Sequence, residues 1–129
     1  MQKCAYIIEF VRDLLRAFKA LSDETRLRIL NILLESERCV CEVMQALDIS
    51  QSRASRNLGL LYDAGFLKSR RDGIWTVYSI DHEAVRQYLP QLVDIIGEEL
   101  KDSKEVASDV ERLKIAERVG TGCIGACKN

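Results

Sequence analysis

The sequence is poor in the residues on which enzymes and membrane-anchored proteins usually depend. It has one histidine and one proline among 129 residues, and a single histidine leaves little room for a general base beside a nucleophile, so we expect no enzyme. No apolar run approaches the roughly 18 residues that a membrane span needs. Because Glu9, Arg12 and Asp13 interrupt the apolar N-terminus, we expect neither a signal peptide nor an anchor, but a cytoplasmic protein with no membrane partner.

An excess of charge of one sign is also missing, whereas apolar residues and cysteines are plentiful. Hydrophobic residues make up 47% of the chain and charged residues 30%, which is ordinary for a soluble fold. The length suits one domain with a packed core. Disulfides are rare in the cytoplasm, so we interpret the five cysteines as metal ligands or redox groups.

Apolar residues at helical spacing predict a mainly α fold. The predicted helices cover residues 5–19, 23–35, a short segment through Val43 and Leu47, 51–64, and much of the chain between Asp81 and about Val119. Ser22 and Ser50 are expected to be N-caps, and Gly65 is expected to be a left-handed C-cap.

The period of the pattern changes after this glycine. Two β-rich runs, residues 66–71 and 74–80, flank Asp72-Gly73, which is the strongest short hairpin signal. A short helix, a three-residue turn, a longer capped helix and a Gly-tipped hairpin follow one another in the order of a winged helix-turn-helix. The fold class is therefore predicted to be mainly α with a small β-hairpin wing.

The longer capped helix has the pattern of a recognition helix, which presents polar side chains to the major groove while its other face packs. Ala54, Leu58 and Leu61 form the stripe expected to be buried. The side chains expected to contact bases or phosphates, two arginines of the hairpin included, are Gln51, Ser52, Arg53, Ser55, Arg56, Asn57, Arg70 and Arg71. The expected partner is double-stranded operator DNA.

Local charge agrees with this partner although the net charge of the chain is −1. Between Ser50 and Ser79, five basic residues stand against two acidic ones, whereas Leu92–Arg118 contains five basic and eight acidic residues. The charge is thus divided along the chain, which fits a basic DNA face and an acidic opposite end.

The stretch from about Phe18 to Ile80 resembles the ArsR/SmtB family of metal-responsive transcriptional repressors, and in particular its arsenical-responsive branch. The motifs that carry the resemblance are LSDETRLRIL, CVCE, SQSRASRNLGLL followed by an AG turn, and DGIWTVY. The resemblance implies a homodimer that binds operator DNA without effector and releases it with effector. Asn57 stands where the family usually has histidine, so we expect altered contacts there rather than lost binding.

The same resemblance implies that Cys39 and Cys41 supply soft thiolate ligands. Residues two apart point about 200° apart on a helix, so both sulfurs can bind one ion only if the first turn is frayed or is unwound by binding. A helix N-terminus also favours the thiolate form, and Arg38 helps, whereas Glu37 and Glu42 oppose it. Capture of the effector is then expected to distort the helix before the recognition helix and to move the DNA-reading surface.

The third ligand of such a site is left open by the sequence. Met44 stands where the family's arsenic motif often has another cysteine, and a thioether is a weak donor. The candidates for a further ligand are Cys123 and Cys127, which lie in the Gly-rich tail of residues 120–129, and Cys4 near the N-terminus; the tail is slightly favoured. The tail pair could also form its own site or a redox disulfide.

The effector is expected to be thiophilic. In the family's zinc and nickel sensors the C-terminal helix carries histidines, which this chain lacks there. Trivalent arsenic (arsenite) or antimony(III) is therefore predicted, with cadmium or lead second. The predicted function is a metalloid-responsive repressor that thiolate ligation releases from DNA. A cadmium/lead-responsive repressor and a repressor switched by thiol oxidation are the alternatives.

The terminal helices have more apolar surface than a core beside the wing can cover, which predicts dimerisation through them. Residues 1–119 are expected to form the winged-helix and dimerisation domain, followed by the tail. The apolar stripes concerned are Ile7, Val11 and Leu14 near the N-terminus and Leu92, Val93, Ile96 and Leu100 near the C-terminus.

Overall fold

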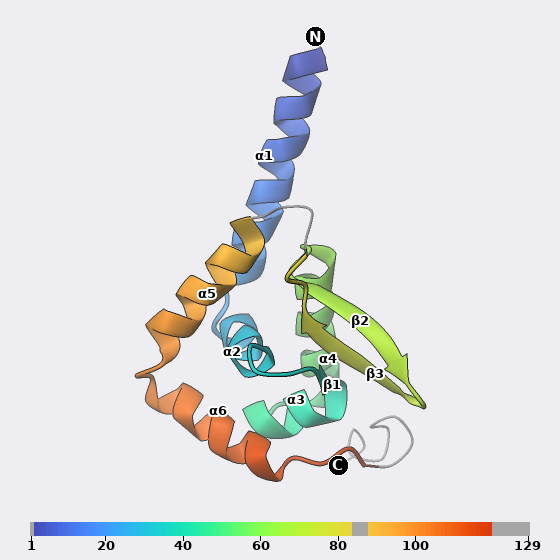
Figure 1. Ribbon diagram of the computed structural model, residues 1–129, viewed down its shortest axis with the longest axis vertical. Helices are drawn as coiled ribbons and strands as arrows, with labels where there is room; N and C mark the ends of the chain where they lie inside the picture. Colours follow the sequence, from blue (N-terminus) through green and yellow to red (C-terminus); the bar gives the residue numbers. More distant parts are fainter. Residues whose placement is uncertain (1, 84–87, 120–129) are drawn as a thin grey trace.

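The computed structural model of the protein describes residues 2–83 and 88–119, with side chains described for residues 11–83 and 89–119. Within these ranges the elements, in chain order, are α1 (Gln2–Leu21), α2 (Glu24–Leu33), β1 (Arg38–Cys39), α3 (Val40–Leu47), α4 (Gln51–Asp63), β2 (Leu67–Asp72), β3 (Trp75–Ile80), α5 (Tyr88–Leu100) and α6 (Lys104–Ile115). Figure 1 shows α1 projecting from a body in which α2, α3 and α4 lie between the C-terminal helices and the hairpin. This is the predicted winged helix-turn-helix arrangement.

Side-chain caps set where α2 and α4 begin. The Ser50 hydroxyl accepts a hydrogen bond from the backbone N–H of Arg53 at 3.2 Å, so this predicted N-cap is confirmed. For α2 the prediction was wrong by one residue, because Asp23 rather than Ser22 is the N-cap and accepts from the Arg26 N–H at 3.1 Å. A carboxylate also interacts favourably with the positive end of the helix dipole, which favours Asp23 over a serine.

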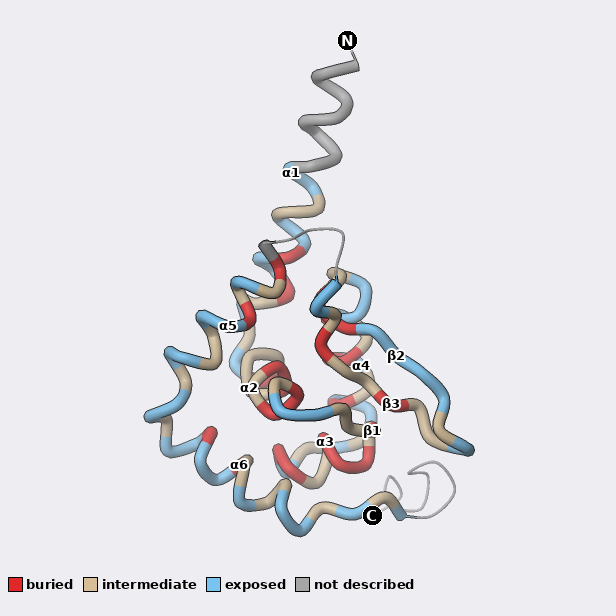
Figure 2. The backbone as a smooth tube through the Cα atoms, in the orientation of Figure 1, coloured by how far each residue is buried: buried red, intermediate tan, exposed pale blue. Residues whose placement is uncertain are grey.

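The core lies between α2, α3 and α4 and is closed by the hairpin and α5, as the buried segments of Figure 2 show. Its largest fully buried side chains include Phe66, Ile29, Leu30, Leu58 and Leu61. Ala54, Leu58 and Leu61 have no exposed surface, which confirms the predicted buried stripe of α4. Packing of this stripe fixes the opposite face of α4 toward solvent.

The sheet has three strands in the order β1-β3-β2, all antiparallel. Since Asp72 pairs with Trp75, the two loop residues of the hairpin are Gly73 and Ile74, not Asp72 and Gly73 as predicted. Gly73 has a φ of 63°, and a glycine of positive φ at the first loop position is typical of a type II′ hairpin turn. β1 was not predicted from the sequence, because two residues are too short to show an alternation.

The C-terminal region forms two helices where the sequence suggested one helix running to about Val119. α5 ends at Leu100, and Ser103 caps α6 by accepting from the Val106 N–H at 3.4 Å. The chain therefore turns, and α6 crosses beneath α3 before residues 116–119 run toward the hairpin tip (Figure 1).

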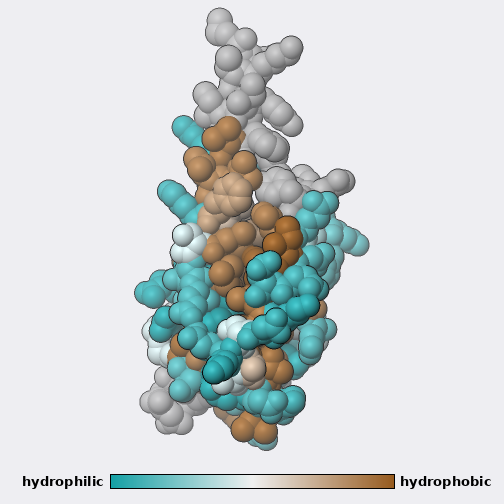
Figure 3. Space-filling model, turned by 90° about the vertical axis from the view of Figure 1, so that its left-hand side faces the viewer, coloured by the Kyte–Doolittle hydropathy of each residue, from teal (hydrophilic) through white to brown (hydrophobic). Residues whose placement is uncertain are grey.

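The exposed apolar face of the terminal helices coincides only in part with the stripes predicted for dimerisation: Val11 is exposed, Leu14 and Leu100 are partly buried, and the side chain of Ile7 lies outside the described ones. Val93 is buried in the core, and Leu92 and Ile96 pack against it, so the stripe of α5 serves largely within the protomer. The large apolar side chains that are exposed on these two helices are Val11, Leu15 and Phe18 of α1 and Ile95 of α5. Figure 3 shows apolar surface gathered over α1 and the neighbouring α5. None of the described helices has the length and apolar character to cross a membrane.

A buried carboxylate fastens α6 to the body. Asp109 has no exposed surface and accepts from Arg28 of α2 at 2.8 Å (Nε) and from Arg112 at 2.9 Å (Nη2). Arg112 in turn donates from Nε to the Ala46 carbonyl of α3 at 2.7 Å. One carboxylate thus joins α6 to both α2 and α3.

We expect Asp109→Ala to lower the free energy of unfolding by about 3 kcal/mol, because breaking a buried ion pair leaves two guanidinium groups without their acceptor. Chemical denaturation followed by circular dichroism measures this loss. Glu111→Ala is the matched control on α6: its ion pair with Lys114 is exposed, and such pairs contribute about 0–1 kcal/mol. Equal stability of the two variants would contradict the anchoring role of Asp109.

Candidate functional site

The solvent-facing side of α4 carries most of the polar residues predicted to read DNA. Ser52, Arg53 and Arg56 are exposed, and Gln51 and Ser55 are partly exposed. The Gln51 amide donates to the Ser55 hydroxyl at 3.1 Å. A row of amide, hydroxyl and guanidinium groups therefore projects from the N-terminal half of a rigidly packed helix, as major-groove recognition requires.

Asn57 is placed differently from the sequence expectation. Its side chain is buried, its Nδ2 donates to the Arg53 carbonyl at 2.9 Å, and its Oδ1 accepts from Arg26 at 3.0 Å. Arg26 also donates to the carbonyls of Ala20 and Lys19 at the end of α1, at 2.6 and 3.1 Å. Asn57 thus connects α4 to α2 and α1 inside the protein, instead of facing solvent with its neighbours.

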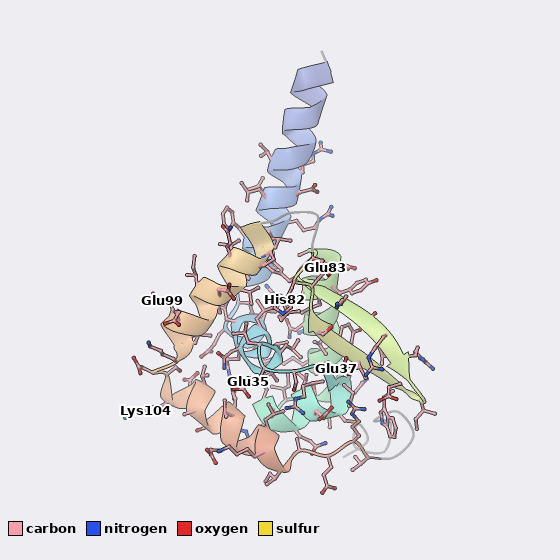
Figure 4. The ribbon with its side chains drawn as sticks, in the orientation of Figure 1. Glu35, Glu37, His82, Glu83, Glu99 and Lys104 are labelled. Carbon is pink, nitrogen blue, oxygen red and sulfur yellow. The ribbon has the colours of Figure 1, made fainter. Side chains whose placement is uncertain are left out.

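The predicted arginines of the hairpin are both exposed on β2. Arg70 forms an ion pair with Glu37, which Figure 4 shows beside β1, and its Nε lies 2.9 Å from a Glu37 carboxylate oxygen. This hydrogen bond holds the pKa of Glu37 below its usual value. The ion pair therefore orients Arg70 toward Glu37, and Arg71 is exposed on the edge strand β2.

Cys39 and Cys41 lie at the junction of the sheet and α3. Cys39 ends β1, pairs with Val77 of β3, and is also the N-cap of α3 in an extended conformation. Both cysteines are fully buried and form one small cluster with Val77, against which Val40 and Trp75 pack. The cysteine pair is thus in direct contact with the strand that carries the wing.

This geometry corrects the expectation that helical spacing keeps the two sulfurs apart. The separation of about 200° applies to two residues within a helix, but Cys39 lies outside α3 with φ −86° and ψ 169°. An extended N-cap residue and a first-turn residue can turn their side chains into one cluster, as these two do.

The electrostatics of Cys39 also differ from the expectation that the helix N-terminus would favour thiolate. Burial raises the pKa of the Cys39 thiol, and the neighbouring Glu42 carboxylate opposes ionisation as well. Glu42 itself occupies the helix N-terminus, since it accepts from the Cys39 N–H at 3.0 Å. Although burial alone would raise the pKa of Glu42, its hydrogen bonds from Cys39 and Arg118 lower it. The carboxylate carries the negative charge, and the thiol stays protonated.

The end of the described chain comes to the same place. The side-chain amide of Gln45 donates to the Glu117 carbonyl at 2.5 Å, and its oxygen accepts from the Glu117 N–H at 3.0 Å. The Val119 carbonyl oxygen then lies 3.8 Å from the Cys41 sulfur. Cys41 is disulfide-bonded, and Cys39 is not its partner.

The candidate further ligands cannot be placed from the described residues. Cys123 and Cys127 lie outside them, and the side chain of Cys4 is not described. Within the described part of the chain, no group of three Cys, His, Asp or Glu residues could hold a metal ion. His82 is exposed at the end of β3 away from the hairpin tip (Figure 4). A three-thiolate site at Cys39 and Cys41 therefore needs a sulfur from elsewhere.

The structural contacts of three residues important to this region were not predicted from the sequence. Arg26 joins three helices, Glu42 caps α3, and Arg118 contacts Glu42 and the hairpin. Charged residues in helices usually indicate a solvated face, and only their long-range partners distinguish these three. The Glu three residues after Cys39 was the one available signal, since it matches the spacing of a capping box.

The fold is a winged helix-turn-helix: α4, the second helix of the helix-turn-helix, has an exposed polar face, and the hairpin lies beside it. These features define the class of DNA-binding regulators. The profile of the bacterial regulatory protein ArsR family matches residues 23–69. Together with the relatives described next, this match shows that the chain belongs to the ArsR family.

Relatives of this chain include regulators of resistance to arsenic and cadmium. The chain is 40% identical over 101 residues to the arsenic resistance transcriptional regulator ArsR1 of Pseudomonas putida, a match covering 78% of this chain and 75% of the relative. It is 45% identical over 76 residues to a cadmium resistance regulatory protein, the CadC homologue of Staphylococcus aureus, covering 58% and 63%. It is 46% identical over 67 residues to the arsenical resistance operon repressor of Escherichia coli, covering 51% and 57%. In the last two matches the chain spans less than two thirds of the relative.

Solved structures of similar fold are winged helix-turn-helix proteins. A homodimeric winged helix-turn-helix DNA-binding domain of Mycobacterium bovis, a possible ArsR-family regulator, is 26% identical with a TM-score of 0.62; the match covers 75% of this chain and 86% of that one. The transcriptional repressor BigR of Xylella fastidiosa is 25% identical with a TM-score of 0.59, covering 77% and 98%.

We expect Asn57→Ala to destabilise the protein by about 1–3 kcal/mol, because Arg26 loses a buried acceptor and α4 loses its link to α1 and α2. Arg56→Ala is the matched control one residue earlier on the helix; its side chain is exposed, and its stability should stay within about 0.5 kcal/mol of the wild type. Thermal and urea denaturation measure both. An Asn57→Ala variant as stable as Arg56→Ala would show that the buried amide is not structural.

Proposed function

We propose that the protein is a cytoplasmic transcriptional repressor that binds operator DNA as a homodimer and leaves it when trivalent arsenic or antimony binds Cys39, Cys41 and a further thiolate. The observation that carries this proposal is the pairing of Cys39 with Val77. Because the cysteine pair is packed against the strand that carries the wing, a change at the sulfurs acts directly on a DNA-contacting element.

The DNA side of the proposal rests on the exposed groups of α4 and the hairpin. Gln51, Ser52 and Ser55 present hydrogen-bonding groups from the N-terminal half of α4, and Arg53 and Arg56 present guanidinium groups. Arginine reads guanine or holds phosphate, and amides and hydroxyls reach base edges. Arg70 and Arg71 extend the basic surface along β2. Asn57 supports the reading face from within through Arg53.

Homodimerisation is supported by the exposed apolar side chains of α1 and α5. Val11, Leu15 and Phe18 are each about half exposed, as is Ile95, and contiguous apolar surface of this kind marks protein–protein contacts. The M. bovis domain of similar fold is homodimeric. A dimer places two copies of α4 side by side, which suits two half-sites of an operator.

The effector side rests on the chemistry of the two buried cysteines, both of which are thiols once the disulfide of Cys41 is reduced. Undissociated arsenous acid exchanges hydroxide for thiolate without net release of protons: As(OH)₃ + 3 RSH gives As(SR)₃ + 3 H₂O. Burial keeps the Cys39 thiol protonated, which suits this exchange. Divalent cadmium must instead displace one proton from each thiol that it binds. The protonated resting state therefore favours the metalloid over the divalent ion.

The further thiolate is proposed to come from Cys123 or Cys127 of the tail, residues 120–129, rather than from Cys4. Residues 116–119 run along α3, and Val119 lies beside Cys41. Cys123 follows Val119 by four residues, which is a reach of at most about 14 Å for an extended chain. The described part of the domain, residues 1–119 in our division, thus ends beside the cysteine pair, which supports a ligand from the tail.

A repressor switched by thiol oxidation is the second candidate, because Cys41 is disulfide-bonded. In that scheme a peroxide oxidises one thiol to a sulfenic acid, RSH + H₂O₂ giving RSOH + H₂O, and a second thiol then forms the disulfide with loss of water. Arsenite binding needs the reduced protein, so the two candidates respond to different treatments of the same cysteines.

The proposal predicts that arsenite weakens operator binding of the reduced wild type about 5–150-fold, the usual range of an allosteric coupling. Cys39→Ser/Cys41→Ser should bind operator with wild-type affinity and show no response, because a serine hydroxyl replaces each thiolate. Fluorescence anisotropy of labelled operator DNA measures both. Full arsenite response in the double variant would contradict the assignment of this pair, and release by peroxide but not by arsenite would favour the redox candidate.

The choice of effector predicts a calorimetric difference. Arsenite binding to the reduced protein should release almost no protons near neutral pH, whereas cadmium should release about one for each protonated thiol ligand. Isothermal titration in two buffers of different ionisation enthalpy measures the protons released. Tight cadmium binding together with undetectable arsenite binding would replace the metalloid by the divalent ion as effector.

A further inference from the structure

We propose that Arg118 couples the cysteine pair to the wing: it fastens the hairpin tip to the first turn of α3, and effector capture at Cys39 and Cys41 releases that fastening. This inference rests on the proposed function and names how that site would regulate DNA binding. Arg118 belongs neither to the recognition helix nor to the apolar stripes predicted for dimerisation. We assign it a positioning role.

The contacts of Arg118 join three segments that are distant in the sequence. Its Nε donates to the Glu42 carboxylate at 3.0 Å, and its Nη1 donates to the Asp72 carboxylate at 2.8 Å. Its guanidinium carbon also lies 6.0 Å from the centre of the Trp75 ring, within the range of a cation–π contact. Asp72 and Trp75 are the pair that closes the hairpin loop, so the guanidinium holds the wing at its tip.

Glu42 makes this fastening sensitive to the cysteines. One of its carboxylate oxygens accepts both the Cys39 N–H at 3.0 Å and the Arg118 Nε. The other accepts from Arg38 at 3.2 Å. A change in the backbone of Cys39 that breaks the cap of α3 therefore moves the same carboxylate that holds Arg118.

The cysteine pair touches the wing from the other side as well. Trp75 packs against the cluster of Cys39, Cys41 and Val77, while its ring also lies under Arg118. The indole Nε1 is buried with no hydrogen-bond partner in the described structure. No hydrogen bond therefore holds the ring, which is supported by the cysteine cluster and by Arg118, and a rearrangement of the sulfurs alters one of these two supports.

The charge of the wing tip gives the fastening an effect on DNA. Arg118 neutralises Asp72 at the end of β2, the strand whose Arg70 and Arg71 are proposed to extend the DNA-binding surface. Release of Arg118 leaves the Asp72 carboxylate without this counter-charge, and a negative charge beside a DNA-binding surface repels phosphates. Loss of the clamp and gain of repulsion both weaken operator binding.

A purely structural role of Arg118 would be to anchor residues 116–119. Gln45→Ala is the matched control for that role, because it removes both hydrogen bonds to Glu117 without touching the wing. Arg118→Lys is the second control, since it keeps the positive charge but cannot donate to Glu42 and Asp72 from one planar group. Together, the three variants distinguish the anchoring of residues 116–119, the positive charge of residue 118 and its simultaneous contacts with Glu42 and Asp72.

The test measures operator affinity with and without arsenite for the full-length reduced protein and each variant. Arg118→Ala should bind operator about tenfold more weakly than wild type, and the further weakening by arsenite should shrink by a similar factor, since the release has already occurred. Arg118→Lys should be intermediate, and Gln45→Ala should keep the full arsenite response. Wild-type affinity and a wild-type arsenite response in Arg118→Ala would overturn the proposal.

Hydrogen exchange of the DNA-free protein separates this inference from the proposed function. The backbone amides of residues 72–75 should exchange faster in Arg118→Ala than in wild type or Gln45→Ala, with no effector present. If they do, and wild-type operator binding ignores arsenite, the fastening stands and the effector assignment fails. Unchanged exchange at the hairpin tip would overturn the fastening whatever the response to arsenite. Because Trp75 is the one tryptophan in the chain, its fluorescence gives a parallel reading of the same tip.

Discussion

The antiparallel pairing of Cys39 with Val77 is the interaction on which the rest of this structure depends. It makes one residue the end of a strand, the N-cap of α3 and a member of the buried sulfur cluster. A sheet of three strands transmits displacement from one edge to the other, because its backbone hydrogen bonds have narrow geometric limits. A bond formed at the sulfurs is therefore opposed by the backbone pairing that positions the wing.

Three charged residues hold the surrounding helices in place around this pairing. Asp109 holds α6 against α2 and α3, Arg26 holds the end of α1 to α2 and α4, and Glu42 caps α3. Each satisfies several partners at once, so each is costly to remove and hard to replace by an apolar contact. The recognition helix is thus supported on its buried face by packing and at its edges by polar networks, while the hairpin is supported mainly at its base and tip.

Local sequence signals predicted the parts of the fold that local chemistry decides. Ser50 is an N-cap, Gly65 adopts a positive φ of 93°, and the hairpin forms around Gly73, as expected. The start of α2, the loop register and the break between α5 and α6 were missed because caps and turns compete within one or two residues. β1, the burial of Asn57 and the contacts of Arg118 depend on partners 31 to 76 residues away, and no local pattern reports such partners. The raised pKa of Cys39 could not be predicted from local sequence either, since burial in the tertiary structure causes it.

The proposed function requires that a change at the cysteine pair reaches the wing through the pairing of β1 with β3, while the recognition helix stays folded. Amide hydrogen exchange followed by NMR, on the reduced protein with and without arsenite, measures this directly. We expect arsenite to accelerate exchange in residues 38–39 and 77–78 and to leave the amides of α4 protected. Unchanged protection of the β1–β3 amides in an arsenite-saturated protein, or loss of protection throughout α4, would contradict it.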